Sequence, residues 1–241
     1  MRIISWFSCG SASAVATKLA LKEYPDSIPV YCETNSEHPD NERFMNDCSK
    51  WFGKKIEIIQ SLKYKDVDDI IEKTKYMSGI AGARCTVELK KVPRLNFQLP
   101  DDIHIFGYTL EEEKRAERFK VTNFELNLKF PLIENKITKQ DTLALLKEVR
   151  IEMPTMYKQG FEHNNCIGCV KASSLTYWAR IRQYYPDVFK TRCEQSRKLG
   201  VRLIKIGGER RFLDELPEHT AFEYESEPSC DFLCQVISND L

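Results

Sequence analysis

The stretch Ile3-Ile4-Ser5-Trp6-Phe7-Ser8-Cys9-Gly10-Ser11-Ala12-Ser13 decides the fold of this chain. Its apolar first half predicts a short buried strand, and the Ala- and Leu-rich residues that follow, up to residue 24, predict a helix. The connecting residues 8–13 form the serine loop. Small side chains there let backbone amides approach an anion, the serine hydroxyls can donate to it, and the positive end of the helix points at it. The serine loop therefore has the form of a phosphate cradle, although small residues also serve simple tight packing.

Helical and extended patterns alternate along the first half of the chain. After the serine loop we expect strands at residues 28–32, 56–60 and 103–107, and helices at residues 39–52, 66–74 and 110–124. This alternation predicts an α/β domain over residues 1–130, with a parallel sheet flanked by helices. In residues 131–241 we expect helices at 138–149 and 173–184 and a strand at 201–206. These elements predict a helical, cysteine-rich C-terminal region that packs on the same sheet.

The composition is that of an ordinary compact globular protein. The 241 residues include 36 Lys or Arg and 36 Asp or Glu, a balance that argues against indiscriminate nucleic-acid binding. No run approaches the ~20 apolar residues that cross a bilayer, and the first residues do not form a signal peptide. We therefore expect a cytoplasmic protein without membrane contact. In that reducing compartment the nine cysteines would serve metal or redox chemistry, or the core, rather than disulfides.

Charge is distributed unevenly toward the C-terminus. Residues 171–211 hold eleven Lys or Arg and three Asp or Glu, whereas residues 212–241 hold eight Asp or Glu and no Lys or Arg. Either the acidic tail folds back on the basic segment, or the basic segment meets phosphates. In the second case Arg180, Arg182 and Arg192 contact a nucleic-acid backbone and Trp178 stacks on a base. Independently of the tail, these arginines can instead serve a dimer interface, and Trp178 can instead belong to the core.

Cysteine spacing gives a second functional signal. Cys166-Ile167-Gly168-Cys169 places two thiolates on one tight turn, where both can reach one metal ion or cluster. Cys230 and Cys234 form a looser second pair, so that two pairs could make a four-cysteine site. Cys193 is ambiguous. We expect Cys9, Cys32 and Cys48 to pack inside the protein. Cys9 is the least certain of the three because it lies in the serine loop.

Two further segments carry residues that could face a ligand. Cys85 lies in a loop beside Arg84 and near Lys90 and Lys91, whose charges would lower its pKa and favour the thiolate. Residues 107–118 place a glycine at the end of a strand and a charged helix after it. Such positions face the ligand crevice in parallel sheets. A solvated helix face with paired charges is the alternative for this segment.

Taken in order, these segments resemble the phosphoadenylyl-sulfate (PAPS) reductase family of the PP-loop, or N-type ATP pyrophosphatase, superfamily. The serine loop is neither a Walker loop nor a GxGxxG turn. It is similar to the family's Ser-Gly-Gly-x-Asp-Ser, of which Ser8, Gly10 and Ser13 are kept, while Cys9 replaces the second residue, the first glycine, and Ala12 replaces the Asp. After the second expected strand, Glu33-Thr34 is similar to the family's Asp-Thr, in a region that lies near the nucleotide in that family.

Later segments extend the resemblance to about residue 190. Cys85-Thr86-Val87-Glu88-Leu89-Lys90-Lys91-Val92-Pro93 is similar to the Cys-Thr-x-x-Leu-Lys-x-x-Pro of relatives that act in sulfur modification of nucleic acid. Residues 107–118 are similar to the family's Gly-x-Arg-x-x-Glu/Gln-Ser-x-x-Arg, with Gly107 and Glu112 retained, Thr109 in place of the first Arg, and Arg115 or Arg118 as the closing base. The most specific series runs through Pro131-Leu132, Thr138-Lys139-Gln140-Asp141, residues 154–161 and Asn165-Cys166-Ile167-Gly168-Cys169, in the family's order.

The resemblance implies an adenine nucleotide alpha hydrolase-like, Rossmann-type fold and a set of binding residues. Nucleotide contacts would come from Ser8, Cys9, Gly10, Ser11, Ser13, Glu33, Thr34, Gly107 and Glu112. Cys85, Cys166 and Cys169 would bind a [4Fe-4S] cluster beside the nucleotide. The fourth ligand stays open between Cys193, Cys230, Cys234 and an iron left free for sulfide or substrate. A structural zinc ion held by Cys166, Cys169, Cys230 and Cys234 is the alternative.

Three functions remain open at this point. The first is a sulfur-transfer enzyme that adenylates an acceptor with ATP and Mg²⁺, with Lys90, Lys91 and Arg115 stabilising charge and a nucleic acid as a possible acceptor. The second is a true PAPS or adenylyl-sulfate reductase, in which the Cys230 thiolate attacks the sulfur and thioredoxin releases sulfite. The third is a non-catalytic nucleotide or nucleic-acid binding module. A homodimer is compatible with each of them.

Overall fold

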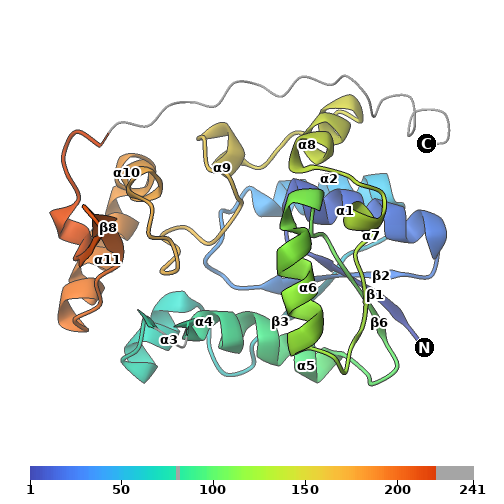
Figure 1. Cartoon of the computed structure of the whole chain (residues 1–241), viewed down its shortest axis with the longest axis horizontal. Helices are drawn as coiled ribbons and strands as arrows, with labels where there is room; N and C mark the ends of the chain where they lie inside the picture. The colour runs from blue at the N-terminus through green and yellow to red at the C-terminus, as the bar shows by residue number, and fades with distance from the viewer. Residues whose placement is uncertain (80–81, 221–241) are drawn as a thin grey trace.

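A twisted parallel sheet forms the centre of the first half of the molecule (Figure 1). The computed structural model describes residues 1–79 and 82–220. Within them the main sheet has five strands in the order β3-β2-β1-β6-β7, and every neighbouring pair is parallel. The strands are β1 (Ile3–Phe7), β2 (Ile28–Glu33), β3 (Glu57–Gln60), β6 (Ile103–Phe106) and β7 (Asn127–Lys129). The expected α/β fold with a parallel sheet and flanking helices is confirmed.

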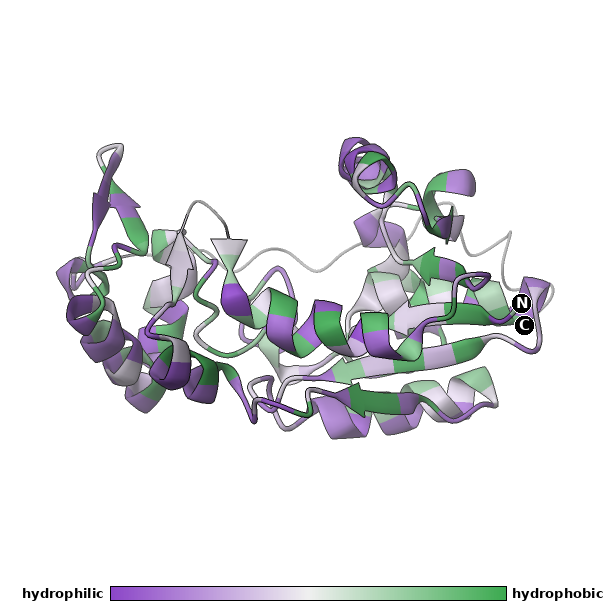
Figure 2. Ribbon diagram, turned by 90° about the horizontal axis from the view of Figure 1, so that it is seen from below, coloured by the Kyte–Doolittle hydropathy of each residue, from purple (hydrophilic) through white to green (hydrophobic). Residues whose placement is uncertain are grey.

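Helices cover both faces of this sheet, as parallel strands require. Figure 2 shows the largely hydrophobic strands with helices on either side. On one face α1 (Ser11–Glu23) and α2 (Asn41–Phe52) bury Val15, Phe44 and their neighbours against Phe7. On the other face the ring of Phe97 in α5 (Val92–Phe97) lies 6.3 Å from that of Trp6 in β1. The other elements between β3 and β7 are α3 (Val67–Thr74), β4 (Ser78–Gly79), β5 (Gly82–Ala83), α4 (Arg84–Thr86), η1 (Val87–Lys91), η2 (Leu110–Glu112) and α6 (Glu113–Thr122).

The second half of the described chain is mainly helical. It contains α7 (Pro131–Glu134), α8 (Lys139–Glu148), α9 (Thr155–Lys158), α10 (Leu175–Tyr184), α11 (Pro186–Lys198), the strands β8 (Ile204–Ile206) and β9 (Glu209–Arg211), and η3 (Leu213–Glu215). Helices α8 and α10 lie where the sequence predicts them. The strand expected at residues 201–206 is shorter, and it pairs only with β9, in a separate two-stranded sheet within the described residues.

Two hydrophobic cores each combine both halves of the sequence. The first joins residues 7–56 to residues 132–151, because α7 and α8 pack against α1. The second joins residues 64–89 to residues 156–216, with Met156, Trp178 and Ile181 fully buried at its centre. Trp178 is thus a core residue, and base stacking by this side chain is ruled out. No helix in the described ranges is long and apolar enough to span a membrane.

Candidate functional site

The serine loop lies at the carboxyl end of β1, where it is closed by its own hydroxyl groups. Ser13 Oγ accepts a hydrogen bond from the Ser8 amide at 3.0 Å and donates one to the Gly10 carbonyl at 2.9 Å. Cys9, fully buried, adopts a left-handed φ of 53°, which turns the chain sharply between Ser8 and Gly10. All three predicted hydroxyl donors make hydrogen bonds within the protein, and of the three only Ser8, whose Oγ donates to Ser13 Oγ at 3.2 Å, is exposed.

Lys139 places a cation at the serine loop. It is the first residue of α8, and its Nζ donates to Ser11 Oγ at 2.8 Å and to the Tyr157 hydroxyl at 3.0 Å. Thr138 and Asp141 form a capping box that fixes this helix start. Lys139 is not among the residues predicted from the sequence, although it lies in the Thr-Lys-Gln-Asp segment that carries the resemblance. Its position two residues before a capping Asp and directly after the capping Thr was the available signal.

Gly107 lets the end of β6 pack directly against the serine loop. β1 and β6 are neighbours in the sheet, so their carboxyl ends meet at one edge. A Cβ atom at position 107 would lie 2.8 Å from the carbonyl oxygen of Ala12 and 2.8 Å from the backbone nitrogen of Ser13. Neither backbone atom can move without displacing the start of α1. Only glycine fits here.

We expect Gly107→Ala to destabilise the protein by about 1 to 3 kcal/mol, because relieving this contact requires a backbone shift in a well-packed region. Chemical denaturation of the variant and the wild type measures the difference in the free energy of unfolding. An unchanged free energy of unfolding would show that β6 and the serine loop are not packed as described.

The loop after β2 contacts one of the predicted cysteine ligands. Glu33 Oε1 accepts from the amides of Thr34 and Asn35, each at 2.8 Å, so this carboxylate shapes its own loop. Thr34 is almost fully buried, and its Oγ1 lies 3.5 Å from Cys166 Sγ. The structure therefore brings Thr34, which follows Glu33 in the chain, next to a predicted metal ligand.

The cysteine turn, residues 164–169, is hydrogen-bonded to two strand ends of the main sheet. Asn164 Nδ2 donates to the Cys9 carbonyl at 2.7 Å, and the Ile167 amide donates to the Ser36 carbonyl at 2.9 Å. Tyr177 in α10 holds the turn from the other side: its hydroxyl accepts from the Cys169 amide at 2.7 Å and donates to the Cys166 carbonyl at 3.1 Å. Asn164 is not predictable from the sequence, because a polar residue two positions before a cysteine pair has no distinctive pattern.

The three predicted cluster ligands lie close enough to affect one another. Burial, and next the charge of Glu37, raise the pKa of Cys166 to about 12, with Cys169 acting in the same direction. Burial, and next Cys169, also raise the pKa of Cys85. The prediction that basic neighbours lower the pKa of Cys85 was wrong. Burial outweighs the opposing charges of Lys171 and Lys90, and Arg84 turns to Glu88 in an ion pair at 3.1 Å.

Cys193 is the one other candidate ligand within the described residues. Burial, and next the charges of Asp214 and Glu194, raise the pKa of Cys193 to about 11, which places its thiol on α11 facing η3. Cys230 and Cys234 fall outside the described residues. Within residues 1–79 and 82–220, no three His, Cys, Asp or Glu side chains are arranged to hold a single metal ion. The chemistry of the three neighbouring thiols fits iron, since Fe–S clusters are held by Cys thiolates.

Lys90 faces the same region and is paired with a buried carboxylate. Its Nζ lies 3.0 Å from Glu37 Oε1, and the Glu37 side chain is only 3% exposed. The second oxygen of Glu37 accepts from the Tyr31 hydroxyl at 2.8 Å and from Asn41 Nδ2 at 2.9 Å. Partial burial alone would lower the pKa of Lys90, but Glu37 and the Cys166 thiol raise it overall. Lys90 is therefore a fixed cation beside the cysteine turn.

The other predicted cations are more exposed. Lys91 is exposed, one residue after Lys90. Arg115 forms an ion pair with Glu112 and lies over the ring of Tyr108, 5.1 Å from its centroid. Burial, and next the charge of Lys139, lower the pKa of His163, while Glu112 acts in the opposite direction. Because Lys139 and Glu112 both act on the pKa of His163, the start of α6, which follows Glu112, lies on the same side of the molecule as Lys139.

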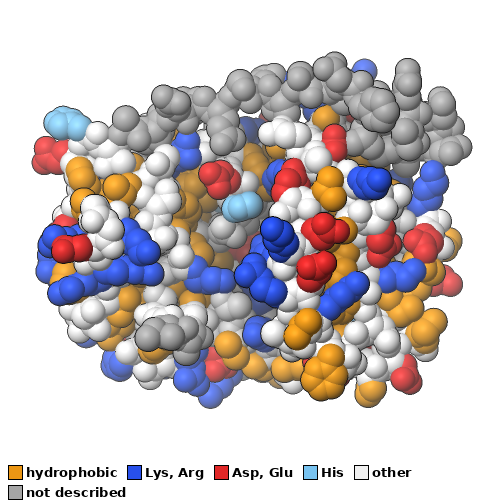
Figure 3. Space-filling view, viewed as in Figure 1, with side chains coloured by type: hydrophobic (Ala, Val, Ile, Leu, Met, Phe, Trp, Pro, Cys, Tyr) orange, Lys and Arg blue, Asp and Glu red, His pale blue; other side chains and the backbone are white. Residues whose placement is uncertain are grey.

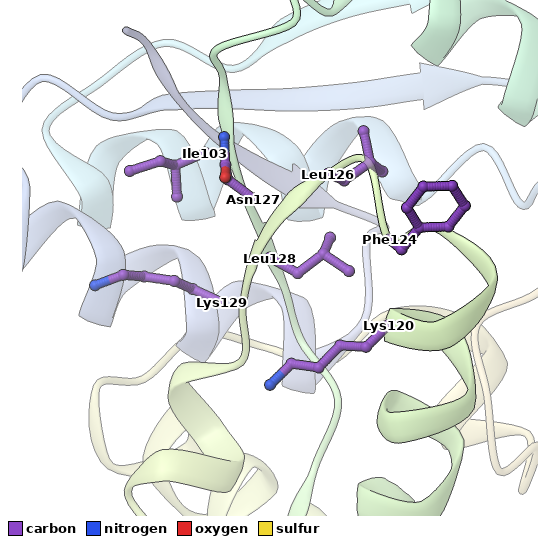
Figure 4. Close-up of a pocket in the computed structure, with 7 residues that line it drawn as sticks. All are labelled: Ile103, Lys120, Phe124, Leu126, Asn127, Leu128 and Lys129. Carbon is purple, nitrogen blue, oxygen red and sulfur yellow. The ribbon is translucent and has the colours of Figure 1, made fainter.

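A hollow and a separate pocket mark the surface. Figure 3 shows a hollow in the middle of the face drawn, between α6 and the α10–α11 end, with Lys, Arg and His side chains at its border. Figure 4 shows a different cavity, of about 430 Å³, lined by Ile103, Lys120, Phe124, Leu126, Asn127, Leu128 and Lys129. Ile103 begins β6, whereas Gly107 follows its end, so this second cavity lies away from the serine loop.

Comparison with known proteins settles the family. The family model for the phosphoadenosine phosphosulfate reductase domain matches residues 2–175. The chain belongs to this family. The match covers the serine loop, Cys85 and the cysteine turn, and it ends in the first turn of α10, before α11 and the β8–β9 hairpin. The resemblance read from the sequence is thereby confirmed, and with it membership of the PP-loop superfamily.

Two individual proteins are similar to this chain. The uncharacterized protein MJ0973 of Methanocaldococcus jannaschii is 25% identical over 215 residues, which cover 80% of this chain and 47% of the relative. The chain thus spans about half the length of that curated relative. The crystal structure of phosphoadenylyl-sulfate reductase from Candida auris, in a phosphate complex, matches with a TM-score of 0.52. At 11% identity over 69% of this chain and 81% of that one, this similarity shows the fold.

Proposed function

We propose that the chain is a PP-loop enzyme of adenylation-coupled sulfur transfer, which binds ATP at the serine loop beside an iron–sulfur cluster held by Cys85, Cys166 and Cys169. One observation carries the proposal: the cysteine turn is hydrogen-bonded to the serine loop through Asn164 and touches the end of β2 through Thr34. A nucleotide and a thiolate-bound group on these two segments would be neighbours, so one substrate can reach both.

The nucleotide part of the proposal rests on the local charge and shape. The amides at the start of α1 and the positive end of that helix favour phosphate oxygens. Lys139 adds a cation at Ser11, and Mg²⁺ would neutralise the pyrophosphate leaving group. An acceptor oxygen attacks the α-phosphate, the bond to the β-phosphate oxygen breaks, and a sulfur nucleophile then displaces AMP. Lys90, held by Glu37, is placed to stabilise developing negative charge at the cysteine side.

The iron–sulfur part rests on the thiols. When bound, such a cluster supplies iron that can carry sulfur or electrons. The protein's own part is to fix the three thiols: Tyr177 orders the turn of Cys166 and Cys169, and α4 delivers Cys85 from the opposite segment. The family's reductases are the competing activity. A direct assay separates the two, since adenylation yields AMP and pyrophosphate from ATP, whereas reduction yields sulfite from PAPS with reduced thioredoxin.

We expect Lys139→Ala to weaken ATP binding tenfold to a hundredfold, because a charge-assisted contact contributes about 1.5 to 3 kcal/mol. Isothermal titration calorimetry with Mg²⁺ and a non-hydrolysable ATP analogue measures the affinity. Lys158→Ala is the matched control, since Lys158 is exposed on nearby α9 and pairs with Glu152. Equal affinities for all three proteins would remove the serine loop from the nucleotide site.

A further inference from the structure

The β8–β9 hairpin is a basic projection outside the segment that defines the family. The two strands are joined by Gly207 and Gly208, whose φ values of 58° and 86° are those of a tight hairpin turn. In Figure 1 the hairpin lies with α11 at the end of the molecule away from the main sheet, and Figure 2 shows it projecting from the helices. The basic hairpin comprises this turn and the exposed side chains of Lys198, Arg202, Lys205 and Arg210.

Like charges are held together on this hairpin. Lys205 and Arg210 are direct partners in the antiparallel register, so both side chains project from the same face. Like charges placed directly opposite one another destabilise a strand pair. Within the described part of the chain, none of the four cations of the basic hairpin lies within ion-pair distance of a carboxylate. An anionic partner would offset the repulsion between Lys205 and Arg210, which are direct partners in the hairpin.

An aromatic ring adds a second kind of contact. The guanidinium groups of Arg197 and Arg202 lie 4.1 Å and 5.3 Å from the ring centroid of Phe212, which follows β9. Arg197 is also held by Asp214 at 2.8 Å, whereas Arg202 has its charge open to a ligand. An ordered, planar guanidinium on an exposed surface suits both bidentate phosphate contacts and stacking on bases.

The arginines singled out in the sequence do not provide this surface. Arg192 is 2% exposed, with its charge paired to Asp68 and its Nε donating to the Gly168 carbonyl. Arg182 donates to the carbonyls of Leu216, Pro217 and Glu218. Arg180 is buried. Of the two alternatives for these side chains, contact with a nucleic-acid backbone is disfavoured, because Arg180 and Arg192 are buried and Arg182 is held by backbone carbonyls. Figure 3 shows the exposed Lys and Arg side chains gathered instead over α11 and β8.

We propose that the basic hairpin binds the sugar–phosphate backbone of a nucleic acid. Exposed cations on and beside a projecting hairpin, with Arg210 steadied by the Leu203 carbonyl and Arg202 over an aromatic ring, match a regularly spaced polyanion that also offers flat bases. The chain as a whole has no net charge, so the attraction is local to this surface. The inference goes beyond the proposed function, since binding here requires neither ATP nor a cluster.

Fluorescence anisotropy on the full-length protein tests this inference. The probes are a labelled 20-base-pair DNA duplex, an RNA hairpin and a single-stranded RNA, each titrated at several salt concentrations. For Lys205→Ala/Arg210→Ala we expect affinity at 100 mM salt to fall about tenfold or more. On the duplex, the slope of log K against log salt should fall by nearly two, at ~0.9 for each lost phosphate contact. The three probes show which form of backbone is preferred.

Lys50→Ala/Lys55→Ala is the matched control, since both lysines are exposed on or next to α2 and the variant loses the same charge. Thermal midpoints of both variants verify folding. The inference is overturned if the wild type binds none of the probes at 50 mM salt, or if the two variants lose affinity equally. It is also overturned if polyglutamate competes as well as unlabelled nucleic acid, which would indicate an acidic polypeptide as the partner. Absent ATP turnover leaves the result unaffected, so the two proposals fail separately.

Discussion

Full-length protein carrying Cys166→Ser and purified without oxygen should lose nearly all of its iron, acid-labile sulfide and visible absorption. Cys166 lies between the end of β2 and the other predicted ligands, because its thiol contacts Thr34 and it shares a tight turn with Cys169. A hydroxyl group in its place is a poor ligand for iron, which prefers thiolates in these clusters. Cys85→Ser and Cys169→Ser should give the same loss if the three thiols hold one group.

Cys32→Ser is the matched control for this series. Cys32 is partly buried near the same region, where its Sγ lies 3.8 Å from the Lys90 carbonyl, but it is not among the proposed ligands. We expect this variant to keep its iron. Full iron content in Cys166→Ser would contradict the ligand assignment, and one zinc ion per chain without iron in the wild type would favour the structural-zinc alternative.

Lys90→Met should lower the free energy of unfolding by about 2 to 4 kcal/mol at pH 7. The change leaves Glu37 nearly fully buried without its cation, and removing one partner of a buried pair is strongly destabilising. We place the loss partly below the ~3 to 5 kcal/mol of a fully buried pair because the Lys90 side chain is 44% exposed and Glu37 keeps its hydrogen bonds from Tyr31 and Asn41. Urea denaturation followed by circular dichroism measures the effect.

A double-mutant cycle with Glu37→Gln isolates the pair. If the cost comes from an unpaired carboxylate, the double variant should be more stable than Lys90→Met alone. Lys91→Met is the control for the loss of a lysine in the same helical segment, and its exposed position predicts a change within about 0.5 kcal/mol. A similar loss in Lys91→Met, or a double variant as unstable as the sum of the single ones, would show that the ion pair is not the cause.

The elements with strong apolar patterns could be predicted from the sequence. The apolar run of β1 and the helical spacing of α1 indicate these two elements directly, and together they position the serine loop. The alternation of strands and helices that follows is indicated in the same way. α11 was missed because most of its residues are polar and its few apolar residues form only a narrow stripe. Its start is marked mainly by Pro186. The helical segment from α4 to α5 was missed for another reason: its central π-helix, η1, places side chains off the usual helical spacing.

The site could be predicted in part. The cysteine spacing indicated a thiolate site, but it could not show that Asn164 ties the turn to Cys9, since 155 positions separate the two residues. Lys139 was likewise invisible as a partner of Ser11, because only the packing of α8 on α1 brings them together. The direction of the Cys85 pKa was missed because sequence proximity shows nearby charge but not burial. Contacts between distant segments are what the pattern of a single chain lacks.

The most direct test of the central claim is the electron paramagnetic resonance spectrum of the reduced, anaerobically purified protein with and without a non-hydrolysable ATP analogue. If the cluster and the nucleotide share the site built by the serine loop and the cysteine turn, saturating nucleotide should shift the g values or line widths of the iron signal. The same nucleotide concentration should have less effect on Lys139→Ala. Identical spectra under nucleotide saturation confirmed by calorimetry, or a wild-type protein that holds no iron, would contradict the account.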